Sequence, residues 1–159
     1  MSILSELMKK RLSEAEAPPD FPIGHYRLMV KDAPSEDKFD SGWEILKFPC
    51  RIIEALDDVD EDDLAEYGDL STTLISRDFF SHSDPEYARS NQQTHADLCA
   101  WIENDLQFED DVPTEEAIAQ VKGMTFIAEI GLRQDKNDPN RRYPEIKNTL
   151  PDSDDGDGE

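Results

Sequence analysis

The chain has 159 residues, and 38 acidic against 16 basic side chains give it a formal net charge of −22. This length suits one domain of about 100–150 residues. No apolar run approaches the roughly 18 residues of a membrane span, and the first residues lack the apolar block of a secretory signal. The two cysteines, Cys50 and Cys99, are too few for a disulfide framework, so we expect a cytoplasmic protein.

The negative charge is concentrated in three segments that contain no base. Residues 57–69 hold eight acids, residues 103–116 hold seven and residues 152–159 hold five. These 20 acids account for all but 2 of the 22 net negative charges. An even spread would exclude a nucleic acid as partner, because phosphates repel a surface of their own sign. The uneven spread leaves a nearly neutral body, so nucleic acid remains a candidate.

The first predicted element is a helix over residues 2–16, with Ser2 as its cap. Its apolar residues recur at helical spacing, and the pair Pro18-Pro19 ends it. The apolar positions are Ile3, Leu4, Leu7, Met8 and Leu12. This N-terminal helix or arm, residues 1–19, either docks on the body or stays mobile; the sequence leaves both open.

From Gly24 the apolar period changes to two, which predicts two strands at about 25–31 and 43–56. In the first strand, Tyr26, Leu28 and Val30 share one face, and in the second Leu46, Phe48, Cys50 and Ile52 do. The polar segment 32–42 between them predicts a turn, so the strands are expected to pair as antiparallel neighbours. Pro49 cannot donate a ladder bond and predicts an edge or a bulge.

The remaining elements are short. We expect a strand at 70–75, a helix at 93–106 with Leu98, Trp101, Ile102 and Leu106 on its apolar side, and a helix at 114–122. Thr114 caps that last helix and Gly123 ends it. Strands follow at 124–133 and 141–150, separated by a polar turn, and the tail after Pro151, which has no apolar residue, is expected to be disordered.

Five short strands with inserted short helices predict a mainly β, α+β fold. A small OB-like five-stranded barrel is the first choice and an open α+β sheet the second. The predicted organisation is an N-terminal helix or arm at 1–19, an OB-like domain at 20–151 and a disordered acidic tail at 152–159.

No pattern of catalytic or metal-binding residues emerges. His95 and Cys99 share a helix face, but a zinc site needs three or four ligands, so a partly buried histidine over a core cysteine is favoured. The acidic run from Asp58 has Asp63 where a calcium loop needs glycine, which favours a solvated acidic loop. There is no nucleophile elbow and no phosphate-binding glycine loop. We therefore expect neither an enzyme, nor a metal site, nor a cofactor.

The basic residues alternate along the predicted strands, opposite the apolar faces. If the strands are neighbours, the bases form one stripe with aromatic residues near its ends, which is what binding of single-stranded nucleic acid requires. Solvation of the wet face of a sheet would produce the same alternation. The candidate set is Arg27, Lys31, Trp43, Lys47, Arg51, Arg133, Arg141, Arg142, Tyr143 and Lys147.

Four features together resemble small phage-type single-stranded-DNA-binding proteins. They are the segments at 24–30, 43–56 and 124–151, the last with its run Tyr143-Pro-Glu-Ile-Lys-Asn, and the acidic end. The resemblance implies an OB-type barrel that grips single-stranded DNA, a location in the host cytoplasm, and an acidic tail that recruits replication or recombination proteins. In such proteins the tail usually ends in a hydrophobic or aromatic residue, whereas this chain ends Asp157-Gly158-Glu159.

Three functions follow as hypotheses. The first is a non-enzymatic single-stranded-DNA-binding protein of phage replication or recombination. The second is an acidic DNA mimic that inhibits a nuclease or defence complex, for which the acids of 57–69 and 103–116 must lie along one face. The third is an adaptor that docks through its N-terminal helix. The sequence leaves the oligomeric state open.

Overall fold

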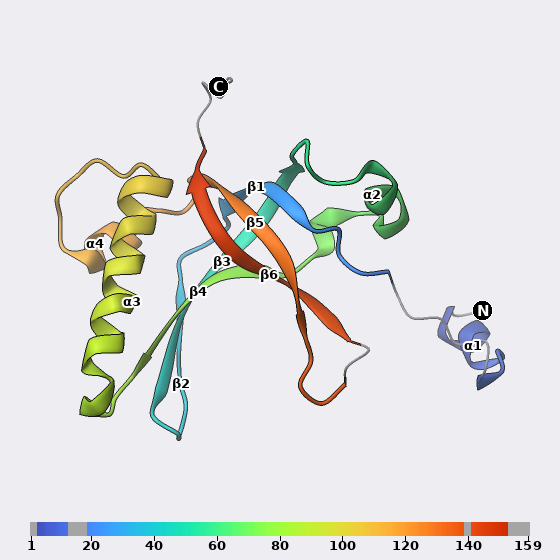
Figure 1. Cartoon of the computed structure of the whole chain (residues 1–159), viewed down its shortest axis with the longest axis horizontal. Coiled ribbons are helices and arrows are strands. Elements are labelled where there is room, and N and C mark those ends of the chain that lie inside the picture. Colours follow the sequence, from blue (N-terminus) through green and yellow to red (C-terminus); the bar gives the residue numbers. More distant parts are fainter. Residues whose placement is uncertain (1–2, 13–18, 139–140, 153–159) are drawn as a thin grey trace.

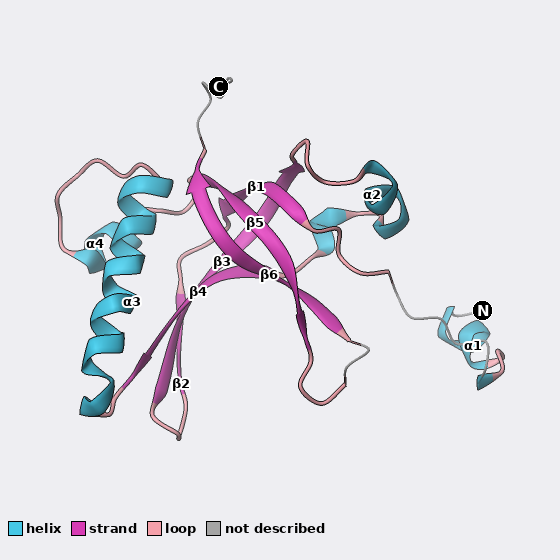
Figure 2. Cartoon of the chain, viewed as in Figure 1, coloured by secondary structure: helices cyan, strands magenta, loops and turns pink. Residues whose placement is uncertain are grey.

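The strands of the molecule form one sheet, and its helices lie around the edges (Figures 1 and 2). The computed structural model describes residues 3–12, 19–138 and 141–152. Every strand pairing is antiparallel, which confirms the predicted α+β class. The strands are β1 (Gly24–Val30), β2 (Ser35–Lys38), β3 (Trp43–Ala55), β4 (Ile75–His82), β5 (Thr125–Gln134) and β6 (Arg142–Pro151).

β1 and β3 form the antiparallel pair that the period of two predicted. Tyr26, Leu28 and Val30 of β1 are buried, as are Phe48, Cys50 and Ile52 of β3. Pro49 lies where β3 passes from pairing with β2 to pairing with β1. The Pro49 carbonyl accepts a hydrogen bond from the backbone N–H of Lys31 at 2.8 Å. The backbone N–H that proline lacks is therefore missing at a position where β3 changes from one neighbouring strand to the other.

The long strand β3 organises the rest of the sheet. Its first half pairs with β2 and with β4, and its second half pairs with β1. With β2 set aside as an excursion between β1 and β3, the order is β4-β3-β1-β5-β6. In chain order, without β2, β5 is the fourth strand, and it lies beside the first strand, β1. This is a Greek-key arrangement, which is compatible with a partly open OB-like barrel.

The barrel is not closed. β4 and β6 contact each other, but no ladder in the described part of the chain joins them. The strand count is six instead of five because the segment predicted as a polar turn contains β2. This open seam between β4 and β6 is where the groove described below begins.

The helices are mostly short. They are α1 (Ile3–Met8), α2 (Glu61–Tyr67), α3 (Ala88–Ala100), which continues as the π-helical η4 (Trp101–Asp105), and α4 (Thr114–Ile118). Trp101 is 1 % exposed and its ring lies 4.9 Å from that of Phe48 and 5.3 Å from that of Phe126. The predicted apolar side of the helix at 93–106 is confirmed, because Leu98, Trp101, Ile102 and Leu106 are all buried. No helix in the described residues is long and apolar enough to cross a membrane.

Two predictions between residues 57 and 75 were wrong for local reasons. The strand expected at 70–75 begins only at Ile75, because residues 70–72 form the 3-10 turn η2 (Leu70–Thr72). The carboxylate of Asp69 accepts the Ser71 backbone N–H at 2.9 Å and caps that turn. The first acidic segment is not only a loop, since residues 61–67 form α2, capped by the side chain of Asp60.

Two helices are shorter than predicted. α1 ends at Met8, its apolar side chains Ile3, Leu4, Leu7 and Met8 are exposed, and residues 13–18 lie outside the described residues. α4 ends at Ile118 and has Pro113 at its N-cap instead of Thr114. Of the tail predicted to be disordered, residues 152–159, the structure describes only Asp152, whose side chain is 8 % exposed and pairs with Arg27; residues 153–159 lie outside the described residues.

Candidate nucleic-acid interface

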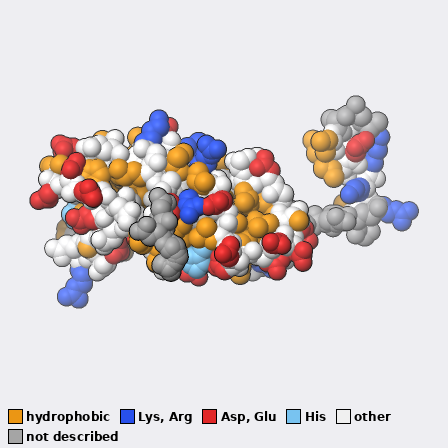
Figure 3. All heavy atoms as spheres, turned by 90° about the horizontal axis from the view of Figure 1, so that it is seen from above, with side chains coloured by type: hydrophobic (Ala, Val, Ile, Leu, Met, Phe, Trp, Pro, Cys, Tyr) orange, Lys and Arg blue, Asp and Glu red, His pale blue; other side chains and the backbone are white. Residues whose placement is uncertain are grey.

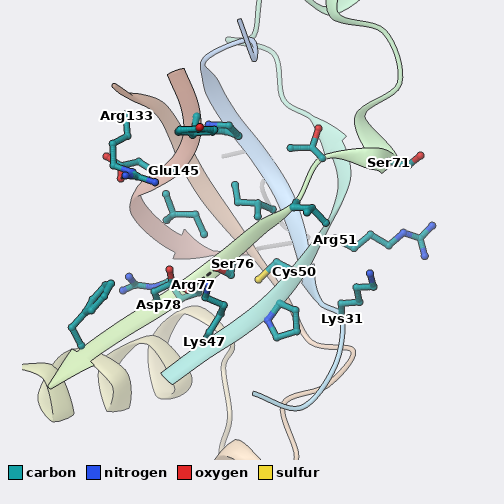
Figure 4. A pocket seen from close by; sticks show the side chains of 18 residues that line it. Lys31, Lys47, Cys50, Arg51, Ser71, Ser76, Arg77, Asp78, Arg133 and Glu145 are labelled. Atoms are coloured by element: carbon teal, nitrogen blue, oxygen red, sulfur yellow. Dashed lines mark hydrogen bonds and ion pairs between the residues drawn. The ribbon is translucent and has the colours of Figure 1, made fainter. Parts of the chain in front are cut away.

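A basic groove of about 870 Å³ runs between the β3–β4 pair and the β5–β6 hairpin. Figure 4 shows Arg133 and Glu145 on one side of this groove and Lys31 and Arg51 on the other, with Ser76 and Cys50 between them. Five bases line the groove against two acids, in a chain whose net charge is −22. The bases are Lys31, Lys47, Arg51, Arg77 and Arg133, and the acids are Asp78 and Glu145.

Strand alternation and register place most of these bases. Lys47 and Arg51 lie on the face of β3 opposite the buried Phe48 and Cys50. Lys31 follows β1 directly, and its bond to the Pro49 carbonyl holds it beside the same stretch of β3. On the other side, Arg133 pairs with Tyr143 across β5 and β6, and its guanidinium lies 5.6 Å from the tyrosine ring centroid.

Arg77 is a groove residue that the sequence analysis missed. It pairs with Phe48 across β3 and β4, so it lies on the inner face of β4, and its guanidinium lies 4.5 Å over the ring of Phe79. Burial lowers its pKa, while nearby acids, Asp105 first among them, oppose that shift; an arginine remains charged all the same. Its Nε is buried and has no hydrogen-bond partner in the described residues. The alternation of Ile75, Arg77 and Phe79 in the sequence could have indicated that Arg77 lies on the inner face of this strand.

The structure gathers half of the predicted site residues in this groove and leaves the others outside. Lys31, Lys47, Arg51, Arg133 and Tyr143 line it. The other five predicted residues lie outside the groove: Trp43, Arg27, Arg141, Arg142 and Lys147.

Acidic neighbours hold most of the outside bases. Arg27 forms ion pairs with Glu54 and, at 3.0 Å, with Asp152. Arg142 lies 2.7 Å from Asp20, and Lys147 lies 2.6 Å from Glu145. Arg141 contacts the Tyr143 ring at 5.8 Å.

Trp43 borders a second, smaller hollow of about 320 Å³ between β4 and α3. This hollow shares Arg77, Asp78 and Phe80 with the basic groove, so the two adjoin each other along β4. Phe80 is 50 % exposed. The Trp43 ring meets those of His82 and Tyr87 edge-on, at 4.8 and 5.2 Å. Aromatic surface is therefore available along the groove and at its end.

The two acidic segments lie away from each other. α2 and α4 occupy opposite ends of the body in Figure 1, and on the face in Figure 3 most acidic side chains gather toward those two ends. The single continuous acidic face that DNA mimicry requires is therefore not formed by residues 57–69 and 103–116 together.

The two cysteines do not form a metal site in the described residues. Cys99 Sγ lies 3.5 Å from His95 Nε2, which in turn lies 3.0 Å from Thr114 Oγ1. No group of three or more potential ligands accompanies them in the described part of the chain. Cys50 borders the groove, but burial raises the pKa of its thiol to about 12, so the thiol is neutral at neutral pH.

No protein-family model and no curated protein sequence matches this chain. Among solved structures, yeast RPA bound to ssDNA is similar over 92 % of this chain and 84 % of that chain, with a TM-score of 0.32 and 11 % sequence identity. A similarity this weak does not establish a common function.

Proposed function

We propose that this chain binds single-stranded DNA in the basic groove, without catalysing a reaction. The observation that carries the proposal is the concentration of positive charge. Five of the 16 lysines and arginines line one groove of a chain with 38 acids. A cluster of like charges costs free energy through self-repulsion, and an anionic ligand offsets that cost.

Four of the five groove bases form no ion pair in the described residues, which supports an anionic ligand. Within the described residues, Lys31, Lys47, Arg51 and Arg77 form no ion pair within 4.0 Å. Carboxylates outnumber bases more than twofold in the chain, so unpaired bases in one place are not explained by a shortage of partners. Phosphate groups along a strand would provide the missing counter-charges.

The aromatic residues favour a single strand over a duplex. Tyr143 lines the groove and the half-exposed Phe80 lines both the groove and the adjoining hollow. Aromatic faces bind unpaired bases by stacking, whereas a duplex keeps its bases stacked on one another. A role in replication or recombination, a phage origin, and recruitment of partner proteins by the acidic tail complete the proposal; these three parts rest on the sequence resemblance alone.

Equilibrium binding of labelled oligonucleotides, followed by fluorescence anisotropy, tests the proposal. A single strand of about 12 nucleotides is compared with a duplex of the same sequence, over a range of salt. We expect tighter binding of the single strand and a slope of log K against log salt of about −3.5, since each neutralised phosphate contributes about −0.7. Absence of binding at low salt, both for the full chain and for a chain ending at Asp152, would reject the proposal, as would equal binding of the duplex.

A further inference from the structure

One carboxylate in the groove has an oxygen without a partner. Asp78 lines the groove and the adjoining hollow, opposite Lys47 in the ladder between β3 and β4. Its Oδ1 accepts a hydrogen bond from Ser76 Oγ at 2.6 Å. No other hydrogen bond or ion pair engages this carboxylate in the described residues, so Oδ2 remains available to a ligand (Figure 4).

The other acid of the groove is in a different state. Glu145 Oε1 accepts from Lys147 Nζ at 2.6 Å, and its Oε2 lies 3.4 Å from Arg133 Nε. Both oxygens of Glu145 are therefore occupied, and its charge is offset by two bases. Asp78 and Glu145 thus form a natural comparison within the same groove.

A carboxylate with a free oxygen repels phosphate, so its place in a DNA-binding groove needs a different ligand group. Bases provide one, because cytosine and adenine carry exocyclic amino groups that donate hydrogen bonds, and aspartate accepts from cytosine N4. Thymine and uracil present a carbonyl oxygen at the corresponding position. That oxygen would face Asp78 Oδ2 as acceptor against acceptor.

Phe80 provides the surface on which such a base would stack. It follows Asp78 by two residues on the same face of β4, at a distance of about 7 Å along the strand. Its ring is 50 % exposed and borders the same two hollows as Asp78. A base stacked on Phe80 therefore has its edge within reach of the Asp78 carboxylate.

We propose that Asp78 and Phe80 form a base-selective subsite that favours bases with an exocyclic amino group over thymine and uracil. Phe80 holds the face of the base and Asp78 Oδ2 accepts from its amino group, while the surrounding lysines and arginines hold the phosphates. The inference rests on the proposed function of the groove. Asp78 is in this view a specificity residue, and Glu145, with both oxygens occupied, is not.

The test compares oligonucleotides of deoxycytidine and of deoxyuridine, about 12 nucleotides long, at neutral pH. The two bases differ only in the pyrimidine edge that carries the amino or the carbonyl group. Wild-type protein should bind the cytidine strand about tenfold more tightly, because the cytosine amino group gains a hydrogen bond that the uracil carbonyl cannot form. In Asp78→Asn this ratio should fall close to one, because the amide of asparagine presents a donor as well as an acceptor.

Glu145→Gln is the matched control, because it removes the same charge from the same groove. It changes the affinity for both strands but should leave their ratio at the wild-type value. Equal affinity of wild-type protein for the two strands would overturn the inference, as would an equal loss of the ratio in both variants. Binding of neither strand would instead reject the proposed function of the groove, so the two failures are distinguishable.

Discussion

The bases inside the groove and the bases outside it are the same residue types on the same kind of strand, yet they are in different electrostatic states. Lys47 and Arg51 have no carboxylate within ion-pair distance in the described residues, whereas Arg27 has two and Arg142 has one. Alternation places both sets on the polar faces of strands. What distinguishes them is whether a neighbouring segment supplies an acid.

This difference separates structural bases from bases available to a ligand. Arg27 joins β1 to the end of β3 through Glu54 and to the segment after β6 through Asp152. Such pairs connect parts of the chain that are distant in sequence and leave little charge for a ligand. Within the described residues, the groove bases Lys31, Lys47, Arg51 and Arg77 make no ion pair, so their substitution should affect binding more than folding.

The largest expected effect comes from reversing charges in the groove. A variant with Lys47→Glu and Arg51→Glu should bind single-stranded DNA at least about 100-fold more weakly at low salt, because two phosphate contacts are lost and two like charges are added. Anisotropy with a labelled single strand measures this loss.

The matched control is Arg141→Glu with Arg142→Glu, which alters the net charge by the same amount outside the groove. This control should change the affinity by only a few-fold through the long-range field. If both double variants lost affinity equally, the groove would have no privileged role and the comparison between the two sets would fail. Urea unfolding should give the groove variant a wild-type-like midpoint, whereas the control loses the ion pair of Arg142 with Asp20 and should show at most a small decrease.

The next largest effect concerns stacking. Phe80→Ala should weaken binding of single-stranded DNA about tenfold, in the range of roughly 1–3 kcal/mol per stacked base. Phe39 is similarly exposed, 53 % against 50 %, but lines neither the groove nor the hollow, so Phe39→Ala should leave binding unchanged. Equal losses in the two variants would indicate a general hydrophobic contact instead of a base subsite.

Local periodicity predicted the strands well because it reports burial directly. The buried residues of β1 follow from alternation alone, and so do Phe126, Ala128 and Ile130 of β5. In β3 alternation gives Phe48, Cys50 and Ile52, but Ile45 is buried on the predicted polar face and Leu46 is only partly buried. The start of β4 was missed because the Asp69 side chain caps a turn at 70–72, a local interaction that competes with strand formation. That error concealed Arg77 and the subsite residues Asp78 and Phe80.

The membership of the groove was only half predictable for a different reason. The sequence places Arg27 and Lys47 on polar faces of strands. It does not show which acids lie next to them, because Asp152 and Asp78 come from other segments of the chain. Asp152 lies 125 residues from Arg27 and bonds it, whereas Asp78 lies opposite Lys47 without an ion pair. Whether a base is neutralised depends on tertiary contacts that a strand pattern does not contain.

A smaller effect, on stability instead of binding, is expected for Arg27. The Asp152 side chain is only 8 % exposed, and it accepts from Arg27 and from Thr125. Arg27→Ala leaves this carboxylate buried with one donor, so the free energy of unfolding should fall by about 1–3 kcal/mol. Urea unfolding measures the change, and affinity for single-stranded DNA should stay within about twofold.

Arg142→Ala serves as the comparison for that loss. Both Arg142 and Asp20 are nearly half exposed, 45 % and 44 % for their side chains, and such pairs contribute roughly 0–1 kcal/mol. A loss of stability in Arg142→Ala as large as in Arg27→Ala would show that burial of Asp152 is not the cause. A strong loss of DNA binding in Arg27→Ala would place Arg27 among the ligand-binding bases instead.

The smallest expected effect concerns the pair between His25 and Asp58, which ties the segment before α2 to β1. Asp58 accepts from the His25 backbone N–H at 3.0 Å and lies 2.7 Å from its Nδ1. Burial acts to raise the pKa of Asp58, but the hydrogen bonds and the charge of His25 outweigh it and lower the pKa. Because Asp58 is half exposed, Asp58→Asn should cost only about 0.5 kcal/mol at neutral pH.

The direction of the pH dependence follows from that lowered pKa. A carboxyl whose folded-state pKa lies below its unfolded value, about 3.9, stabilises the protein above that value and loses this contribution as the pH falls through the folded pKa. The difference in unfolding free energy between wild type and Asp58→Asn, measured in urea at pH 5 and below, should therefore shrink as the pH falls below about 4. If the difference instead grew as the pH fell from about 5 to about 3, burial would dominate at Asp58 and raise its pKa, and the pair with His25 would not stabilise the fold as the ion pairs of Arg27 do.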